Sequence, residues 1–408
     1  MTNGSIIKKD TEIIITEAII TEKRITEMEE KTAKKNQNKK YDPSNANEPE
    51  RKKIFHLTFC RDGGVSVYLR NLIKYSGDEF DTSLVGPEEY RDLPCGFFPI
   101  SAPRKISVFA DIKAAVRLRR LLKKERPDVL YCHSSIAGGV GRIAALGLKC
   151  KTVYNPHGWS FNMTVLSPLK RTLYVWTERF FSGHTDKIIV ISEYEKSSAL
   201  REKICREDKL CVILSGTDTE LLSSYDGARD ELGFDGNNFV VGCAARIVKE
   251  KNPLLFADIA REIIKRCPDA RFVWVGDGDM CGALEERLRE NGIADKTVIT
   301  GWTDIPGKYI SAFDVGLTLS AWEGFGLCSA EYLACGKPVV ATAVGANPEI
   351  INSKSIGRCL DTLDPAEFAE AVLSFRGKNC SAECRASAAR FDIRRTARET
   401  DIAVKELV

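Results

Sequence analysis

The chain has 408 residues, of which 43% are hydrophobic and 29% are charged, and its formal net charge is +3. This length favours two domains, and the small net charge gives no reason to expect a nucleic-acid partner, so any electrostatic argument must be local. The chain starts MTNGSIIKKD, without the apolar stretch of a signal peptide, and has no run of about 18 apolar residues, so we expect a cytoplasmic protein.

The first fifty residues have an unusual composition. A Thr-Glu pair returns every five positions over residues 11–30, a period that fits neither a helix nor a strand. The residues that follow, KTAKKNQNKKYDPSNANEPE, are polar and contain proline, and such a stretch buries too little apolar surface to offset its ordering entropy. The sequence therefore predicts a disordered, low-complexity arm over residues 1–50.

After this arm, the chain twice repeats an alternation of strands and helices. The first run opens with KKIFHLTFC, turns at Gly63-Gly64 into the helical VSVYLRNLIKY, and continues through the strand candidates DVLYCHS, KTVYNPHG, KIIVIS and CVILSG. The second run has the strand candidates FVVGCAARIV, RFVWVGDG, KTVITG, DVGLTLS and KPVVATAVG, with helical segments between them. This alternation predicts an α/β fold with parallel sheets that helices cover on both faces.

We therefore expect two Rossmann-like domains, residues 51–215 and residues 216–390, followed by a helix at 391–408 that returns to the first domain. In open α/β sheets, ligands bind outside the carboxyl ends of the strands. The loops that follow the strands are therefore where we look for functional residues.

The most specific motif of the chain is the segment SAWEGFGLCSAEYLACGKPVVAT. Glu323 and Glu331 lie eight positions apart in it, on either side of a short loop that opens a helix. The loop consists of Gly324, Phe325 and Gly326, and Leu327, a further candidate for donor binding, follows it. Small residues let a backbone approach a phosphate, and the N-terminus of a helix favours its negative charge. Glu331, about one and a half turns into the helix, can present both carboxylate oxygens to a ribose diol.

That segment closely resembles the signature of glycosyltransferase family four, and the resemblance extends in order over roughly residues 53–390. The family implies a GT-B fold, in which two Rossmann-like domains face each other across a cleft. The first domain would bind the acceptor and the second the nucleotide-sugar donor. The resemblance also implies that Glu331 and the glycine loop bind the donor and that Glu323 binds hydroxyls of the transferred sugar. Taken alone, either glutamate is better explained as a cap beside a glycine turn.

Two cations stand where this family neutralises the leaving nucleoside diphosphate. Arg246 and Lys251 lie five positions apart in AARIVKEKN, in the first strand-to-helix loop of the second domain. Ala245 stands where the family usually has glycine before the arginine, a small change that should leave the cations in place. Without the position in the fold, such a pair would more often be a solvated surface, and surface charges are worth little.

The first domain supplies further candidates by the same resemblance. Gly63 and Gly64, in CRDGGVSVYL, match the family's opening glycine loop near the donor phosphates or the acceptor. His157, in NPHGWSF, ends a strand where the family keeps a His-Gly pair facing the sugar, although a lone histidine is commonly a partly buried structural residue. The family's usual Asn-Gly at the domain boundary is Ser215-Gly216 here, which puts any role of that asparagine in doubt.

The acidic pair in VGDGDM raises the alternative of a metal-dependent enzyme. Asp277 and Asp279 resemble the pair by which the other large class of glycosyltransferases holds a divalent cation, and carboxylates suit magnesium or manganese. Since that class has one nucleotide-binding domain, we interpret these aspartates as turn-forming residues and expect no metal. The 14 cysteines include no C-x2-C pair, so neither structural zinc nor a disulfide framework is expected.

The resemblance implies a retaining, metal-independent glycosyltransferase that uses a nucleotide-sugar as substrate and needs no cofactor. The acceptor is not readable from the residues; many members of the family build surface polysaccharide at the inner membrane face, so a saccharide and a lipid-linked acceptor both stay open. Epimerisation of a nucleotide-sugar on the same fold is a second possible function. Binding of a nucleotide-sugar without turnover is a third, and the presence of every expected polar group disfavours it.

A strongly basic helix is predicted over residues 111–126, DIKAAVRLRRLLKKER. Its cations form two adjacent stripes at helical spacing: Lys113, Arg117, Arg120 and Lys124, and Arg119, Lys123 and Arg126. Its apolar residues are expected to anchor it to the domain: Ile112, Ala115, Val116, Leu118, Leu121 and Leu122. A solvated face is the commoner role of such a charge run. Docking on anionic lipid is the alternative, and it would bring the site to a lipid-linked acceptor at the inner membrane face.

Overall fold

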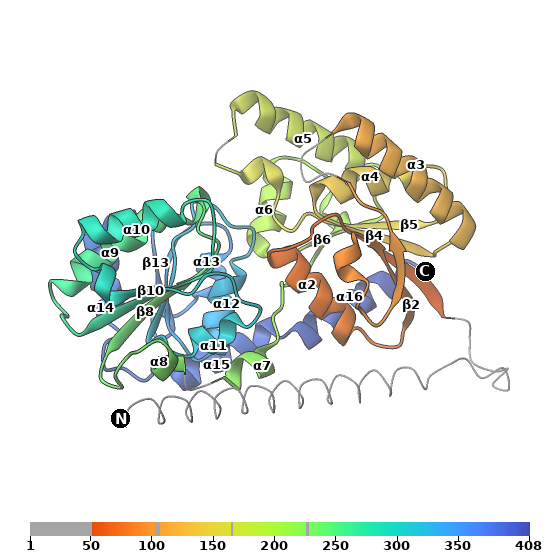
Figure 1. Ribbon diagram of the computed structural model, residues 1–408. Coiled ribbons are helices and arrows are strands. Elements are labelled where there is room, and N and C mark those ends of the chain that lie inside the picture. Colours follow the sequence, from red (N-terminus) through yellow and green to blue (C-terminus); the bar gives the residue numbers. More distant parts are fainter. Residues whose placement is uncertain (1–50, 103–106, 165, 226–227) are drawn as a thin grey trace, which may run out of the picture. The chain divides into compact units, whose positions relative to one another are not determined.

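The computed structural model describes residues 51–102, 107–164, 166–225 and 228–408, and the predicted arm at residues 1–50 lies outside these ranges. The described residues form two parallel β-sheets with helices on both faces of each (Figure 1). Every strand candidate named above is a strand in the structure, so the α/β prediction is confirmed. Within the described ranges, no helix is both long enough and apolar enough to cross a membrane.

The first sheet has seven strands, and its strand order reverses between the first strand and the fourth. In order of pairing, the strands are β3 (Gly96–Pro99), β2 (Phe80–Gly86), β1 (Lys52–Leu57), β4 (Val129–His133), β5 (Lys151–Asn155), β6 (Lys187–Val190) and β7 (Leu210–Val212). In a doubly wound sheet, the loops at such a reversal are where ligands bind. A ligand is therefore expected near the carboxyl ends of β1, β4 and the adjacent β5.

Two apolar layers hold helices to the two faces of this sheet. One layer includes Leu118, Val140, Val175 and Ala199, and the other includes Leu69 and Ala397. The helices on the first face are α3 (Val108–Glu125), α4 (Ser135–Ala145), α5 (Pro168–Ser182) and α6 (Glu193–Arg201). Those on the second face are α2 (Gly64–Tyr75) and α16 (Ile393–Lys405). One face is thus covered by helices that are consecutive in the chain, and the other is completed by α16, the last helix of the chain.

The second sheet has six strands, and its order reverses at its own first strand. In order of pairing, the strands are β10 (Thr297–Ile299), β9 (Ala270–Val275), β8 (Phe239–Ala244), β11 (Val315–Thr318), β12 (Val339–Thr342) and β13 (Gly357–Leu360). One face packs on α9 (Pro253–Ile264), α10 (Cys281–Glu290) and α14 (Pro365–Leu373). The other packs on α7 (Thr219–Ser223), α8 (Ala228–Glu231), α11 (Pro306–Ile310), α12 (Leu327–Ala334), α13 (Asn347–Ile350) and α15 (Ser381–Ala388).

Two segments that connect the sheets run side by side. The backbone N–H of Thr217 donates to Phe391 and that of Ile393 donates to Thr217, each over 2.9 Å. Gly216 is needed at this crossing, because a Cβ there would lie 2.5 Å from Oγ1 of Thr396 and 2.7 Å from Cα of Ile393. The chain thus leaves the first sheet and returns to it through one hydrogen-bonded pair of segments.

A buried ion pair joins α4 to α5. Arg142 is 1% exposed, and its guanidinium donates to Glu178 over 3.0 Å. The other carboxylate oxygen of Glu178 accepts from the Tyr154 hydroxyl over 3.0 Å, and the guanidinium stacks over the Tyr154 ring at 3.9 Å. This network lies between the two helices and the sheet, so it fixes which side of α5 faces inward.

The predicted basic helix forms as α3, but its anchoring differs from the expectation. Leu118 and Leu122 are buried against the sheet as predicted. Ile112 and Val116 are 57% and 45% exposed, so the prediction that they anchor the helix is wrong. The apolar residues of α3 surround more of the helix than one packing face can cover. Arg119 is not available in the predicted basic stripe, because its guanidinium donates to the carbonyls of Ala144 and Leu146 at the end of α4.

Candidate active site

Two loops of the second sheet are joined at the carboxyl ends of adjacent strands. The loop after β8 carries Arg246 and Lys251, and the loop after β11 carries the Glu323 motif. The backbone N–H of Ala321 donates to the carbonyl of Glu250 over 2.8 Å, and the Asn252 side chain donates to the carbonyl of Leu319 over 2.8 Å. These bonds hold the two loops in a fixed relation, as a site built on rigid elements requires.

The Lys251 ammonium and the Glu323 carboxylate form a hydrogen-bonded ion pair. The Ser320 hydroxyl donates to the same carboxylate oxygen over 2.6 Å. Burial by itself lowers the pKa of Lys251, but the neighbouring Glu323 carboxylate outweighs it and the pKa is raised. Lys251 is therefore a fixed cation, and one oxygen of Glu323 is already bonded.

Arg246 differs from Lys251 in being exposed, and its side chain has no hydrogen-bond or ion-pair partner among the described residues. It follows β8 directly, where the strand order of the second sheet reverses. An arginine free of protein partners keeps all its donors for a ligand, and its planar fork suits phosphate oxygens.

The helix α12 carries Glu331 and is locked to the sheet by its next residue. The Tyr332 hydroxyl accepts from the backbone N–H of Ala244 over 2.6 Å and lies 3.3 Å from the carbonyl of Leu317. Gly326 precedes the helix with φ of 94°, and a Cβ there would lie 2.5 Å from the Asn347 side chain. Burial raises the pKa of Glu331 to about 7, and no described residue donates a hydrogen bond to its carboxylate. Glu331 is thus a partly buried carboxyl group without a partner in the part of the chain that the structure describes.

Phe325 and Leu327 present little side chain to a ligand. Phe325 is 5% exposed and packs edge-on against Phe391, with ring centroids 5.5 Å apart. Leu327 packs on the same apolar cluster. The side chains of these two residues belong to the core beneath the loop. If the two residues bind the donor as expected, they do so through their backbone.

A close backbone contact brings the loop after β5 to the loop after β11. A Cβ on Gly324 would lie 2.7 Å from Cα of Gly158, and Gly158 itself has φ of 108°. The Glu195 carboxylate holds the first of these loops, since it accepts from the backbone N–H groups of Trp159 and Ile191 over 3.0 and 3.2 Å. The structure therefore places His157, next to Gly158, beside the Glu323 motif.

A second link between these regions comes from Glu349 in α13. Its carboxylate accepts from the backbone N–H groups of Glu193 and Tyr194, over 3.0 and 2.5 Å, at the start of α6. A carboxylate at a helix N-terminus satisfies donors that the helix leaves free and favours the helix dipole. Neither Glu195 nor Glu349 was predicted from the sequence, because a glutamate in a helix carries no sign of a distant partner.

Three of the four histidines form one hydrogen-bonded chain. Nε2 of His157 lies 3.0 Å from Nδ1 of His133, and Nε2 of His133 lies 3.0 Å from Nδ1 of His56. His56 and His133 belong to β1 and β4, and His157 follows β5, so the chain crosses three adjacent strands near their carboxyl ends. His56 and His133 were missed by the sequence reasoning; their only signal was a histidine near the end of an apolar strand.

This chain fixes the protonation of all three rings together. Burial lowers the pKa of His56 and of His157 to about 3. Burial, followed by the charges of its two neighbours, also lowers the pKa of His133 well below its ordinary value. Each ring is therefore neutral and carries one N–H, which leaves two arrangements in which both hydrogen bonds form. In either arrangement the position of the proton on His157 depends on the two rings behind it.

Gly63 and Gly64 lie at the start of α2, after β1. A Cβ built on either residue meets no atom within 4 Å, and Gly63 has φ of 78°. The backbone is thus open on this side, and the conformation of Gly63 explains why a glycine is required there.

Asp277, the aspartate of the VGDG turn, takes part in turn formation. Oδ1 of Asp277 accepts from the N–H of Gly278 over 2.7 Å, and the carbonyl of Asp277 accepts from the N–H of Ile247 over 2.8 Å. In the described ranges, no three His, Cys, Asp or Glu side chains are grouped so as to hold a metal ion. The cysteines are all unpaired.

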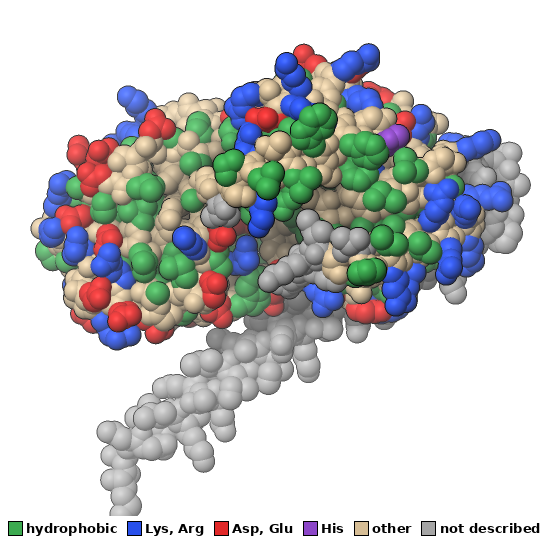
Figure 2. Space-filling model, turned by 90° about the horizontal axis from the view of Figure 1, so that it is seen from above, with side chains coloured by type: hydrophobic (Ala, Val, Ile, Leu, Met, Phe, Trp, Pro, Cys, Tyr) green, Lys and Arg blue, Asp and Glu red, His purple; other side chains and the backbone are tan. Residues whose placement is uncertain are grey.

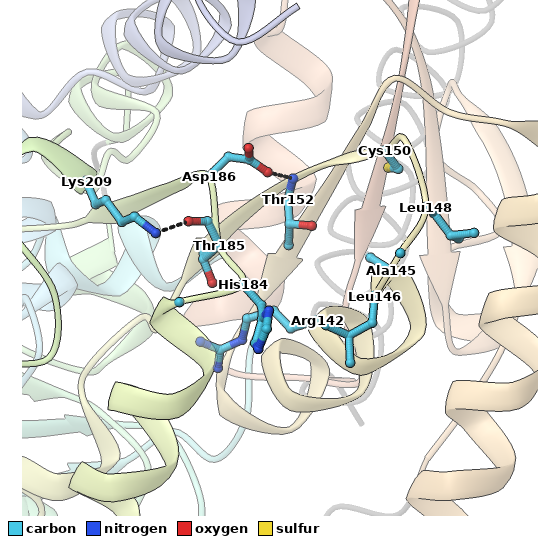
Figure 3. Close-up of a pocket in the computed structure, with 12 residues that line it drawn as sticks. Arg142, Ala145, Leu146, Leu148, Cys150, Thr152, His184, Thr185, Asp186 and Lys209 are labelled. Carbon is cyan, nitrogen blue, oxygen red and sulfur yellow. Dashed lines mark hydrogen bonds between the residues drawn. The ribbon is translucent and has the colours of Figure 1, made fainter.

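A separate pocket of about 370 Å³ lies near the amino ends of strands β5, β6 and β7 of the first sheet (Figure 3). It is lined by Thr152 at the start of β5 and by residues that precede β6 and β7, including Asp186 and Lys209. Asp186 accepts from the Thr152 N–H over 2.8 Å, and Lys209 donates to the Thr185 carbonyl over 2.9 Å. These polar groups satisfy one another, and the pocket is remote from the loops described above.

Comparison with known proteins agrees with this geometry. Residues 238–376 match the family model described as glycosyl transferases group 1, and residues 63–216 match the glycosyl transferase 4-like domain. An Escherichia coli protein named UDP-Gal:alpha-D-GlcNAc-diphosphoundecaprenol alpha-1,3-galactosyltransferase is 31% identical over 354 residues, which cover 80% of this chain and 91% of that protein. The chain belongs to the group 1 glycosyltransferases.

Solved structures show that this glycosyltransferase has the GT-B fold. Anabaena HepE in complex with UDP and glucose superposes with a TM-score of 0.75 at 19% identity, over 87% of this chain and 100% of that one. Sucrose-phosphate synthase from Thermosynechococcus elongatus superposes with a TM-score of 0.76 at 18% identity, over 88% and 99% of the two chains. The predicted family and fold are thus confirmed.

Proposed function

We propose that this glycosyltransferase moves a sugar from a UDP-sugar to a lipid-linked saccharide, with retention of anomeric configuration and without a metal ion. The joining of the Arg246–Lys251 loop to the Glu323 loop carries the proposal, because it gathers cations and a carboxylate at two strand ends. UDP is bound in HepE, and the E. coli relative is named for an undecaprenol-linked acceptor. These names support the donor and acceptor classes that we propose.

The proposed roles follow from the surroundings of each side chain. Glu331 accepts the two ribose hydroxyls, and Glu323 uses its unbonded oxygen for hydroxyls of the transferred sugar. Arg246 and Lys251 stabilise the departing diphosphate, together with the backbone N–H groups at the start of α12. His157 orients the sugar from the opposite loop.

The reaction that we propose needs no carboxylate nucleophile. The bond between the anomeric carbon and the diphosphate oxygen breaks, and the acceptor hydroxyl attacks from the same face as its proton passes to the leaving phosphate. Negative charge then grows on the diphosphate, while the sugar ring becomes oxocarbenium-like. A preorganised cation that meets such charge is worth about 3 kcal/mol of transition-state stabilisation.

Transfer is tested by supplying UDP-sugars singly with a GlcNAc-diphospholipid and analysing the lipid product. We expect one UDP-sugar to yield a longer lipid-linked saccharide with an α-configured new linkage. An altered sugar nucleotide formed without acceptor would favour the epimerase instead. Tight UDP-sugar binding with no product under any combination would favour silent binding.

Donor affinity should weaken as the pH falls. The pKa of Glu331 is about 7, and only its ionised form can accept from both ribose hydroxyls. Below that pH the neutral acid dominates, so the Kd for a UDP-sugar should rise about tenfold for each further unit. Calorimetric titration from about pH 8 to pH 5.5 measures this. The Glu331→Gln variant should bind weakly at all of these pH values; a slope equal to that of the wild type would contradict the assignment.

Activity should be unchanged by a chelator. Arg246 and Lys251 supply the positive charge that a divalent cation would otherwise bring, and Asp277 is engaged in its turn. Initial rates with and without EDTA check this expectation, and Asp277→Asn should have a mild effect. Loss of activity in EDTA and recovery with manganese would restore the metal-binding role of Asp277 and Asp279.

Replacing the middle histidine should slow turnover more than it weakens donor binding. His133→Phe removes both bonds of the chain and leaves His56 and His157 without their buried partner, a loss of about 1–3 kcal/mol. We expect kcat to fall about 10- to 100-fold, with a smaller change in KM and a shifted ¹⁵N signal from the His157 ring. His184→Phe, at the exposed fourth histidine, is the matched control. An unchanged His157 signal would refute the positioning role.

We also propose that the enzyme works at an anionic membrane surface. The C-terminal half of α3 presents exposed cations, among them Arg117, Arg120 and Lys124. Each Lys or Arg near such a surface contributes about 1 kcal/mol. A lipid-linked acceptor is held in that surface, so this basic helix would bring the site to its substrate.

A further inference from the structure

The helix α5 has an apolar stripe that faces away from the protein. Leu169, Leu173, Trp176 and Phe180 are 81%, 60%, 63% and 63% exposed. Their spacing places them within an arc of about 60° on the helix. Large apolar side chains scattered singly on a surface are ordinary, but a continuous stripe is typical of an interaction surface.

The opposite side of α5 is firmly held, so the exposure of the stripe is a property of the fold. Val175 and Phe181 are buried against the sheet, and Glu178 is paired with Arg142. Arg179 donates to the carbonyl of Glu202, which ties the helix to the end of α6. No rotation of α5 could bury the stripe without breaking the buried ion pair.

The neighbouring helices extend the stripe into a surface, which we call the α3–α5 face. Phe109, Ile112 and Val116 are 89%, 57% and 45% exposed on the first turns of α3, and Ile143 is 47% exposed on α4. All three helices cover one side of the first sheet, with α4 bonded to α3 through Arg119 and to α5 through Arg142. Figure 2 looks onto this side of the molecule, where hydrophobic and basic side chains are interspersed.

The charges of the α3–α5 face are almost all positive. The exposed cations on and between these helices are Lys113, Arg117, Arg120, Lys123, Lys124, Arg126, Lys149 and Lys170. The described carboxylates of the three helices are all engaged: Asp111 accepts from the Ser107 N–H, Glu125 pairs with Lys124, and Glu178 pairs with Arg142. Exposed apolar groups among cations fit an anionic lipid surface, with the apolar groups at the acyl boundary and the cations among the headgroups.

We infer that the α3–α5 face inserts into an anionic bilayer, with the apolar stripe of α5 as the inserted element and the cations of α3 as its electrostatic partner. A second copy of the chain is a poorer occupant, because two such faces would bring like charges together. The role that we give to insertion, which is to hold the site over a lipid-linked acceptor, rests on the proposed function. Binding to vesicles can be measured whether or not that function is correct.

Insertion is tested directly through Trp176. Phosphatidylglycerol vesicles should shift the tryptophan emission to the blue, and brominated lipid should quench it. Trp176→Phe should abolish both changes. The control is Trp302→Phe, which should leave both changes intact: Trp302 is 59% exposed and follows β10 of the second sheet. An emission change that survives in Trp176→Phe would overturn the inference.

Two triple variants separate the apolar and electrostatic parts. The first variant combines Leu173→Ser, Trp176→Ser and Phe180→Ser. It should lower vesicle affinity at least about tenfold at both low and high salt, because it removes the apolar side chains that insert. The fold should be kept, because these side chains are exposed and the buried core is unchanged. Arg117→Gln with Arg120→Gln and Lys124→Gln should lower vesicle affinity about fivefold per charge at low salt and much less at high salt. The control carries Trp302→Ser and Leu363→Ser, at residues of similar exposure.

Enzyme assays and sedimentation complete the test. The apolar variant should lose transfer to a lipid-linked acceptor in vesicles and keep transfer to a soluble acceptor. If no donor supports transfer at all, the proposed function fails while the vesicle result still stands. The face is not a membrane-inserting surface if the apolar variant binds vesicles like the wild type. The same conclusion follows if sedimentation shows that the only effect of the substitutions is to turn a dimer into a monomer.

Discussion

Arg246→Ala is expected to lower kcat about 100- to 1000-fold while leaving the thermal stability of the chain unchanged. A preorganised donor aimed at developing charge is worth this much in a transition state. Arg246 is exposed and has no described partner, so its removal costs the fold nothing. This separates it from Lys251, whose loss would leave the Glu323 carboxylate without its cation.

The matched control is Arg266→Ala. Arg266 is also exposed and follows the far end of α9, the helix that begins just after Lys251. Steady-state rates and thermal melts of both variants make the comparison. Full activity of Arg246→Ala against a working donor and acceptor would remove Arg246 from the site.

Glu178→Ala should destabilise the chain by about 3–5 kcal/mol, more than any surface change proposed above. Breaking a buried ion pair leaves the remaining charge uncompensated in a poorly polar environment. Here that charge is the Arg142 guanidinium, which is 1% exposed and already has an Nη1 without a described partner. Urea unfolding followed by circular dichroism measures the change.

A double variant distinguishes a lost charge partner from lost packing. Arg142→Met with Glu178→Leu removes both charges and keeps most of the volume, and such replacements are often neutral or stabilising. We expect it to recover most of the stability lost by Glu178→Ala. A double variant as unstable as the single one would mean that packing, not the uncompensated guanidinium, dominates the effect.

The sequence predicts well what is encoded locally. The strands read directly as apolar runs, and the glycine loop before Glu331 reads as the start of a helix, because both depend on near neighbours. The resemblance identifies four candidate site residues: Arg246, Lys251, Glu323 and His157. The structure brings together the three loops that carry them, which follow β8, β11 and β5. What each side chain touches there was not predictable, since Lys251 and Glu323 are 72 positions apart.

The unpredicted parts depend on strand order and on which side of a helix is covered. The histidine chain exists because β1, β4 and β5 are neighbours, which the order of the strands in the chain does not reveal. Glu195 and Glu349 are ordinary helical glutamates until their partners are known. The exposure of Ile112 was missed because an apolar residue on a helix does not say whether a neighbouring element reaches it.

The position of α16 has a consequence for how the protein is made. Ile393, Ala397 and Val404 complete the apolar layer between α2 and the first sheet, although the last strand of that sheet ends at Val212. At a synthesis rate of about 5–20 residues per second, the ribosome needs on the order of ten to forty seconds to add the roughly 180 residues between them. During that interval one face of the seven-stranded sheet is covered by α2 alone and lacks α16, while the second sheet is still being synthesised. The order of synthesis thus makes the first half the later of the two to be finished, and chaperones that bind nascent chains have their longest opportunity there.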